Sequence, residues 1–439
     1  MCIRDSSCTV VACGSSDDSG AAYAGSAGSG DGHPEAGDSA RGGAATGSAG
    51  YTATGGDSAA GDTSTAGAAG STDAAGAAGA PETSAETQYV ADLEGYSQSP
   101  RVNTSATGAA ELTLSADKKT LSYHITQSVV GATKAHIHLG AAGENGAVVY
   151  PLAPLSADMK GTITLAGATD VANLDSGNFY INVHSATNAD GEIRGQILHP
   201  NETLYVANLT PAQETPPITA TSSGTAQLIV AADKKGFRYH VLSTITAATA
   251  AHIHQGLAGR AGAIVHPFVA GPTIDGQSDF APGEANDLAQ GRWYVNVHTA
   301  AHAAGEIRGQ LMLPGETLYS AALSDAAETP PVTSGGTGNA QFILAPDQKS
   351  IRYELALFGI TPTLAHIHKG ALGVAGPVVY PLALQTGYAN IPTASAGAFG
   401  EQAISAADLT DLEAGTWYAN AHTTAFPMGA TRGQISLTP

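Results

Sequence analysis

Short stretches of alternating apolar and polar residues run along most of the chain, from about residue 87 to the end. In the run Leu121-Ser122-Tyr123-His124-Ile125-Thr126, every second residue is apolar. A period of two is that of a β-strand with one buried face. Gly, Pro, Asn and Asp separate the stretches, and these residues favour tight turns. The pattern therefore predicts short strands joined by short loops.

An all-β fold class follows from the number and spacing of these stretches. No window has the sustained i, i+3, i+4, i+7 pattern of a helix, and a mixed α/β unit would need crossover helices. One short helix is expected around 170–174, with a counterpart at 406–412. About eight short strands in roughly 110 residues are typical of an antiparallel sandwich or Greek-key β-barrel. The expected strands are 88–93, 109–114, 120–128, 133–139, 147–152, 161–165, 178–185 and 192–198.

The same pattern occurs three times in tandem. The copies begin at Thr87, Thr203 and Thr317, and each closes on a Gly-x-x-Arg-Gly-Gln run. A period of this size corresponds to a whole small domain rather than to a solenoid repeat. We therefore predict domains at 87–200, 201–315 and 316–439.

The segment before the first copy has a different composition. Residues 14–86 are mainly Gly, Ala, Ser, Thr and Asp, with ten carboxylates and one arginine. Such a segment has too little apolar surface to offset its ordering entropy, so a disordered tether is expected. The whole chain carries a formal charge of −20. This acidic balance disfavours nucleic acid and anionic membranes as partners.

All three cysteines precede residue 14, so the copies contain no disulfide, thiolate ligand or cysteine nucleophile. The run Val10-Val11-Ala12-Cys13-Gly14 resembles the end of a bacterial lipoprotein signal, in which a cysteine after a small residue is lipidated. Residues 1–13 are then the remnant of such a signal. The alternative is an accidental Ala-Cys before a linker. The resemblance implies an extracytoplasmic protein, either an outer-membrane or cell-surface lipoprotein anchored through Cys13 or a secreted one.

Histidines recur at three equivalent positions in every copy. An Ala-His-Ile-His run is followed by an Asn-x-His run, and alternate residues of a strand share one face. If the two strands are neighbours, three imidazoles converge, which suits copper or zinc better than hard cations. The alternative is a purely structural use of the histidines. The nine residues are His136, His138 and His184; His252, His254 and His298; and His366, His368 and His422.

Two further polar positions accompany the histidines. Asn182, Asn296 and Asn420 lie two residues before the third histidine, on the same strand face. Arg194, Arg308 and Arg432 lie on the last strand of each copy. A same-face Glu192–Arg194 ion pair would explain the first arginine. However, the third copy keeps Arg432 and has Ala430 in place of the glutamate. We therefore assign the arginines and asparagines to an anion-binding or supporting role around the histidines.

The ordered motifs Ala-His-Ile-His-x-Gly, Val-Val-Tyr-Pro, Tyr-x-Asn-Val-His and Gly-Glu-Ile-Arg-Gly-Gln resemble the CHRD domain, the repeated module of chordin. The resemblance covers residues 87–437 and implies an immunoglobulin-like β-barrel in an extracellular setting. The third copy departs from it at Asn420-Ala421-His422 and Gly429-Ala430-Thr431-Arg432.

The histidine positions are also similar to those of copper–zinc superoxide dismutase, which has a copper-binding His-x-His pair, a third copper histidine on a late strand and a late arginine that guides the substrate. By this resemblance His136, His138 and His184 imply one copper per domain, with Arg194 as the anion guide. No bridging histidine or zinc cluster is found between Pro151 and Gly177.

Three functions remain open. The first is a non-enzymatic array of binding modules for a protein or matrix partner, each holding one copper or, second, one zinc. Tandem display favours this function because multivalency raises avidity without new chemistry. The second is a copper-dependent redox enzyme of the dismutase type. The third is an adhesion or spacer array with structural histidines. No catalytic residue is assigned.

Overall fold

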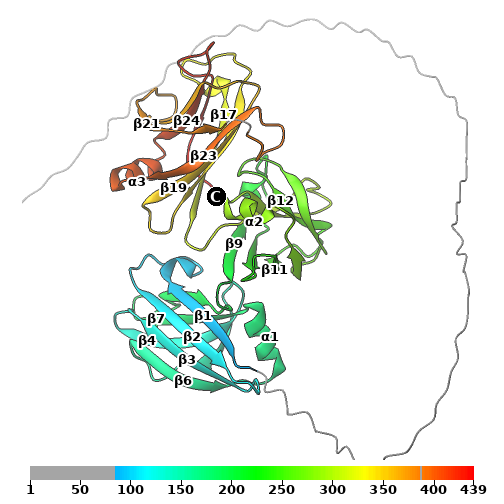
Figure 1. Ribbon diagram of the computed structural model, residues 1–439, viewed down its shortest axis with the longest axis vertical. Coiled ribbons are helices and arrows are strands. Elements are labelled where there is room, and N and C mark those ends of the chain that lie inside the picture. The colour runs from blue at the N-terminus through cyan, green and yellow to red at the C-terminus, as the bar shows by residue number, and fades with distance from the viewer. Residues whose placement is uncertain (1–84, 386–387) are drawn as a thin grey trace, which may run out of the picture. The chain divides into compact units, whose positions relative to one another are not determined.

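The computed structural model of the 439-residue chain describes residues 85–385 and 388–439. These residues form three barrel-like β-domains in tandem, which confirms the predicted all-β class (Figure 1). Cys13, the expected signal at 1–13 and nearly all of the segment 14–86 lie outside the described residues. No helix in the described part combines the length and apolar character needed to cross a bilayer.

The first domain contains all eight predicted strands and the predicted helix, with ends that differ by a few residues. Its strands are β1 (Thr87–Glu94), β2 (Thr107–Leu114), β3 (Thr120–Gln127), β4 (Ala132–Leu139), β5 (Val148–Pro151), β6 (Asp158–Thr164), β7 (Phe179–Ser185) and β8 (Ile193–Gln196). The helix α1 is Ala168–Ser176, and a 3-10 turn, η1, is Gly95–Ser97.

The other two domains repeat this order of elements. The second has β9 (Thr203–Leu209), η2 (Pro211–Gln213), β10 (Gly224–Val230), β11 (Gly236–Ser243), β12 (Ala250–Gln255), β13 (Ala263–Phe268), β14 (Thr273–Asp279), α2 (Glu284–Ala289), β15 (Trp293–His298) and β16 (Ile307–Gln310). The third has β17 (Thr317–Ser324), η3 (Asp325–Ala327), β18 (Thr337–Leu344), β19 (Ser350–Phe358), β20 (Leu364–Lys369), β21 (Val378–Pro381), β22 (Leu384–Gln385), β23 (Ala396–Ala403), α3 (Ala406–Glu413), β24 (Trp417–His422), β25 (Thr431–Gln434) and β26 (Ser436–Leu437).

Strand order places the histidine-bearing strands next to each other. The first domain has the order β5-β4-β7-β8-β1-β2-β3-β6, with all pairs antiparallel. Strands β1, β2, β3 and β6 run side by side in Figure 1. The second domain has the same order in two four-stranded sheets, joined by isolated bridges at Val206–Met312 and Thr210–Arg308. In every domain, therefore, the His-x-His strand pairs with the Asn-x-His strand.

The inward faces of these strands form the hydrophobic core of each domain. On β4, Ala135 and Ile137 are buried in the core, as are Ile181 and Val183 on β7. The alternation that buries these residues sends the histidines between them to the outer face of the sheet. The three histidines of each domain, called the triad below, therefore lie outside the core, beneath surface loops.

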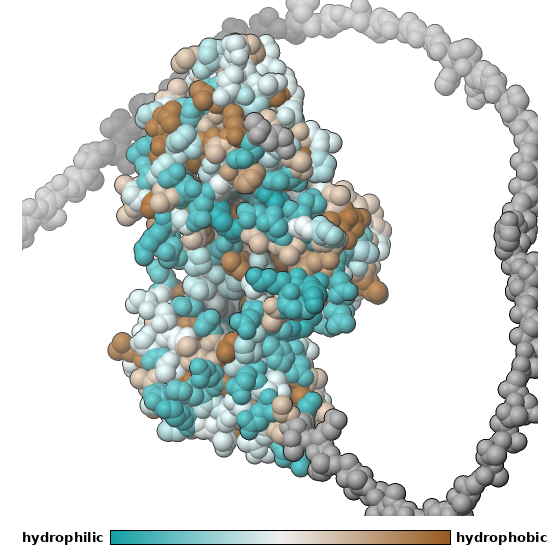
Figure 2. Space-filling model, in the orientation of Figure 1, coloured by the Kyte–Doolittle hydropathy of each residue, from teal (hydrophilic) through white to brown (hydrophobic). Residues whose placement is uncertain are grey.

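Apolar side chains on the surface are scattered. Figure 2 shows small brown groups among larger teal and white areas. Several of the most exposed are single loop residues, such as Val130 at 92% and Val269 at 89%. Scattered apolar residues of this kind are normal on a soluble domain surface.

A large aromatic residue begins the Asn-x-His strand of each domain and is buried in the core, which leads to a stability prediction. Trp293 is fully buried against Phe237 and Phe280, its indole N–H has no hydrogen-bond partner, and the first domain has Phe179 at the equivalent position. We expect Trp293→Ala to lower the free energy of unfolding by about 3–5 kcal/mol. Trp293→Phe should cost at most about 1–2 kcal/mol, because it also removes an unpaired buried donor.

Urea unfolding followed by far-ultraviolet circular dichroism measures both variants against the unsubstituted chain. Equal losses for the phenylalanine and alanine variants would contradict this account of the position.

Candidate functional site

The three predicted histidines come together in every domain. In the first domain, His136 lies opposite Asn182 and His138 opposite Tyr180, while His184 lies opposite Lys134, one diagonal step from His136. The Nδ1 atom of His136 is 3.2 Å from the Nε2 atom of His184. The ring centroid of His138 is 5.6 Å from that of His136 and 6.0 Å from that of His184.

The three triads have nearly the same geometry. The distance corresponding to His136–His184 is 3.1 Å for His252–His298 and 3.0 Å for His366–His422. In each triad, one ligand atom per histidine lies within 4.8 Å of the others, so each group could hold a metal ion. The third domain keeps this arrangement although Ala421 replaces the valine of the other copies.

Backbone carbonyls fix which ring nitrogen of each buried histidine is free. His138 donates from Nδ1 to the carbonyl oxygen of Gly146 at 3.0 Å, and His184 donates from Nδ1 to that of Ala189 at 3.0 Å. Because a carbonyl only accepts, both Nδ1 atoms carry the proton and both Nε2 atoms keep a lone pair. The Nε2 atoms of His138, His254 and His368 are buried and have no hydrogen-bond partner.

Burial keeps the triads neutral. It lowers the pKa of all nine histidines, and that of His254 falls to about 4. Neighbouring imidazoles lower the pKa of His136, His252 and His366 further. At neutral pH the rings therefore present lone pairs, as metal ligands must.

A tyrosine and the predicted arginine support the second histidine from behind. Tyr180 stacks on His138, with ring centroids 4.9 Å apart and planes 13° apart. The guanidinium of Arg194 lies 3.5 Å from the ring centroid of Tyr180. Arginine, tyrosine and histidine form the same stack in the other domains, through Arg308 and Tyr294 and through Arg432 and Tyr418.

The arginine is held by the glycine-rich loop at 140–146, between β4 and β5, rather than by Glu192. Arg194 is 1% exposed and donates to the carbonyl oxygens of Glu144 at 2.5 Å and Ala141 at 2.8 Å. Glu192 instead accepts a hydrogen bond from Thr104. The expected internal ion pair is therefore replaced by loop contacts. Burial lowers the pKa of Arg194 to about 10, so it stays charged at neutral pH.

The asparagines receive different partners in different domains. In the first domain, Asn182 Oδ1 accepts from Gln98 Nε2 at 2.8 Å, and its Nδ2 donates to the carbonyl of Asp190. Glu214 and Glu328 occupy the position of Gln98, at the end of the corresponding 3-10 turns. One carboxylate oxygen of each glutamate is buried without a partner, as are Asn296 Oδ1 and Asn420 Oδ1.

Burial raises the pKa of Glu214 and of Glu328 to about 7, against the opposing effects of the arginine and asparagine beside each. A protonated carboxyl would donate to the asparagine oxygen just as the Gln98 amide does, with the asparagine amide turned accordingly. In the third domain Asn420 Nδ2 donates to Glu328 Oε2 at 3.1 Å, so turning the amide would replace this bond by one from the protonated carboxyl to Asn420 Oδ1.

Sequence reasoning missed two parts of this centre. The first is the set of tyrosines that stack on the second histidine of each domain, Tyr180, Tyr294 and Tyr418, which are not among the predicted site residues. The second is the position of Gln98, Glu214 and Glu328, which is not among them either. The signal available for it was a polar residue recurring at the same step after the first strand.

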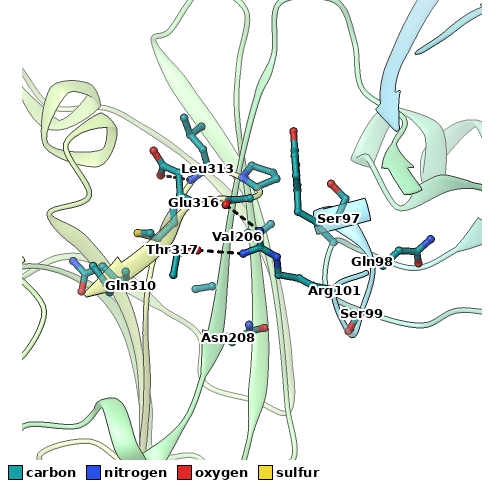
Figure 3. Close-up of a pocket in the computed structure, with 18 of the residues that line it drawn as sticks. Ser97, Gln98, Ser99, Arg101, Val206, Asn208, Gln310, Leu313, Glu316 and Thr317 are labelled. Atoms are coloured by element: carbon teal, nitrogen blue, oxygen red, sulfur yellow. Dashed lines mark hydrogen bonds between the residues drawn. The ribbon is translucent and has the colours of Figure 1, made fainter. Parts of the chain in front are cut away.

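A separate cavity of about 700 Å³ lies among the loop 96–101, strand β9 and the segment 310–318 (Figure 3). Arg101 reaches across it to Thr317 Oγ1 and to the carbonyl oxygen of Gly315, each at 3.3 Å. Gln98 and Arg194 also line it, whereas no triad histidine does. The cavity therefore touches the supporting residues of the first centre and not its metal-binding face.

Comparison with known protein families gives one match, and it repeats three times. The model of the CHRD domain matches residues 89–197, 205–311 and 319–435. Each matched range contains one complete triad. No curated protein and no solved structure is significantly similar to the chain.

The buried glutamates predict a pH dependence of stability. A folded-state pKa of about 7, above the ordinary 4.5, means that the folded state holds the proton more tightly than the unfolded chain. The stabilisation is complete below pH 4.5 and is lost as pH rises through 7. We expect a loss on the order of 2–3 kcal/mol per glutamate across this window, removed by Glu214→Gln in the second domain.

Trp293 lies in the second domain, so its fluorescence in a Trp417→Phe background follows that domain during urea unfolding. Gln98→Glu is the reverse exchange and should introduce the same dependence into the first domain, measured by circular dichroism. A Glu214→Gln variant that keeps the full pH dependence would contradict the protonated state.

Proposed function

Because the chain belongs to the CHRD family, with three CHRD domains and a histidine triad in each, we propose that every domain is a binding module that holds one metal ion through its three histidines. One observation carries this proposal. In all three copies the second histidine buries an Nε2 lone pair that meets no donor. Leaving a buried polar atom unpaired is costly, and a metal ion in the triad would satisfy it.

The spacing of the nitrogens supports a single ion per triad. Zinc and similar ions bind imidazole nitrogen at about 2.0–2.1 Å, so two nitrogens on one ion at an angle of about 100° lie about 3.1 Å apart. The observed distances between the first and third histidines are 3.0–3.2 Å. Without an ion, this pair can share only one hydrogen bond, and the Nε2 atom of the second histidine makes none.

Copper is the metal we propose first, with zinc second. Three neutral imidazoles without a carboxylate favour borderline ions over calcium or magnesium, and copper binds most tightly among the divalent first-row metals. His138 and His184 each donate their Nδ1 hydrogen to a backbone carbonyl. Metal-binding histidines in proteins are commonly oriented by such a hydrogen bond from the ring nitrogen that does not bind the metal.

We further propose that the array is displayed outside the cytoplasm on a lipid attached to Cys13. The support is the Val-Val-Ala-Cys run, the acidic segment after it and the absence of cysteine after residue 13. Three modules on one anchored chain would bind a protein or matrix partner with avidity.

A second candidate function is redox catalysis on a small anion such as superoxide, by analogy with copper–zinc superoxide dismutase. Its support is that His136, His252 and His366 are only partly buried, which leaves one side of each triad facing solvent. A bound copper would supply one-electron chemistry. Arg194 counts against it as an anion guide, since it is buried and donates to the Ala141 and Glu144 carbonyls.

Titration with Cu(II) and Zn(II), followed by calorimetry, tests the metal site. We expect the full chain to bind about three ions, since three triads are present. The variant His252→Ala/His254→Ala/His298→Ala should bind about two. The matched control His302→Ala alters a histidine of the same domain outside the triad and should still bind three.

A folded chain that binds no ion, or a triple variant with unchanged stoichiometry, would leave the histidines with a structural role. Superoxide consumption by the copper-loaded chain, lost in the triple variant in proportion to its missing site, would favour the redox candidate over simple binding.

Lipidation is tested independently. Expressed in a bacterium, the chain fused behind a complete lipoprotein signal ending at Ala12 should incorporate labelled palmitate and enter the membrane fraction. The Cys13→Ser variant should do neither, because the acceptor thiol is gone. Equal labelling of both would remove Cys13 as the anchor.

A further inference from the structure

The glycine-rich loop beside the first triad is covered by the following domain. Gln227, on β10 of the second domain, is 2% exposed. Its Oε1 accepts a hydrogen bond of 2.7 Å from the Ala142 backbone N–H, and its Nε2 donates to the Gly177 carbonyl at 3.3 Å. Ala141 and Ala142 are in consequence 2% and 8% exposed. One glutamine side chain thus joins the second domain to the loop of the first centre.

The second and third domains meet through the equivalent atoms. Gln341, on β18, is 1% exposed and accepts from the Ala258 N–H at 3.2 Å. Its Nε2 donates to the Gly291 carbonyl, also at 3.2 Å. At the rim of the two junctions, Arg238 donates to the Ser176 carbonyl at 3.2 Å, and Arg352 donates to the Ala289 carbonyl at 2.5 Å. Each arginine is also paired with a glutamate of its own domain, Glu202 or Glu316. The same docking chemistry is therefore used twice.

These contacts lead directly to the histidines. The loop residue Ala142 follows Ala141, whose carbonyl accepts from Arg194. Arg194 lies on Tyr180, which stacks on His138. The same loop ends at Gly146, whose carbonyl fixes the His138 tautomer and whose N–H donates to the Tyr180 hydroxyl. A shift of this loop therefore displaces the partners that orient His138.

Comparison of the three copies separates docking residues from residues that every domain needs. The first domain carries Glu111 and Ser122 at the positions that Gln227 and Arg238 occupy in the second domain and Gln341 and Arg352 in the third. Glu111 is exposed. A carboxylate cannot donate to a carbonyl as the glutamine amide does, so Glu111 cannot make the contacts that Gln227 and Gln341 make at the junctions.

The loop of the third centre has no such cover in the structure. Leu372, the counterpart of Ala142 and Ala258, is 79% exposed, and Val374 is 53% exposed. Among the described residues, Arg432 of the same domain supports this loop, and its donors reach the Ala371 and Val374 carbonyls.

The charged pairs at the two junctions are oriented oppositely. The preceding domain supplies the acid at the first junction and the base at the second, so each domain fits only its own neighbour. His240 of the second domain pairs with Glu144 of the first at 3.0 Å, whereas Arg292 of the second pairs with Glu354 of the third at 2.7 Å. Docking the third domain onto the first would place Glu354 against Glu144. Like charges at a buried contact oppose such a mismatch.

From these contacts we propose that Gln227 and Gln341 are positioning residues that act across a domain junction. Each fixes the loop of the preceding domain and thereby strengthens metal binding at the histidine triad of that domain. This inference rests on the proposed metal-binding function. It makes the sites of the described chain unequal, because the first two gain a glutamine contact from the following domain, whereas Leu372 in the loop of the third is exposed.

Full-length chains with a single intact triad test the proposal, the other two triads carrying His→Asn at all three positions. Affinity for Cu(II) and for Zn(II) is measured by competition with a colorimetric chelator. Gln227→Met should weaken the first site about fivefold to tenfold and leave the second unchanged, since methionine keeps the volume and loses the hydrogen bonds. Gln341→Met should weaken the second site and leave the first unchanged, so each variant is the matched control of the other.

The outcomes separate this inference from the function on which it rests. If the single-triad chains with both glutamines intact bind neither ion, the proposed metal site fails. If they bind and Gln227→Met changes the first site by less than twofold, the positioning role alone fails, and an equal loss at both sites also overturns it. Should circular dichroism show that Gln227→Met does not fold, Arg238→Gln opens the same junction at its rim, and it too must weaken the first site selectively.

Discussion

The hydrogen bond from a histidine Nδ1 to a loop carbonyl is the interaction on which each centre depends. It selects the tautomer of His138 that carries the proton on Nδ1, so Nε2 keeps its lone pair and faces the other two histidines. Burial then keeps the ring neutral by lowering its pKa. Together these effects leave neutral imidazole nitrogens close to one another, an arrangement that could hold a metal ion.

The supporting layers follow from that constraint. The carbonyl of Gly146 must stay in place, and the loop that carries it has few side chains of its own to anchor it. Arg194 provides the anchor by donating to two carbonyls of the loop while it packs on the tyrosine that stacks on His138. A buried arginine that makes only neutral contacts is unusual, and its position explains why Arg432 persists in the third domain where Ala430 replaces the glutamate.

The differences among the copies are as informative as their common features. Gln98 and Glu214 occupy one position, and burial raises the pKa of Glu214 to about 7. When it is protonated, this carboxyl can donate to the asparagine as the Gln98 amide does. Glu111 and Gln227 also share a position but differ in what surrounds them. The first lies on an exposed sheet face, and the second is buried in a junction. The tandem arrangement thus changes residues at the junctions and preserves those around the histidines.

The strands, the three tandem copies and the three candidate ligands of each domain could be predicted from the sequence, because a period of two fixes which residues share a strand face. The sequence also placed the asparagine and the arginine near the histidines. The pairing of β4 with β7, the buried Nε2 atoms and the stack through Tyr180 were decided by the tertiary structure. The same is true of the raised pKa of Glu214 and the docking of Gln227, since both result from burial by residues distant in sequence. Local patterns show which side of a strand a residue takes, and only the packed chain sets what lies against that side.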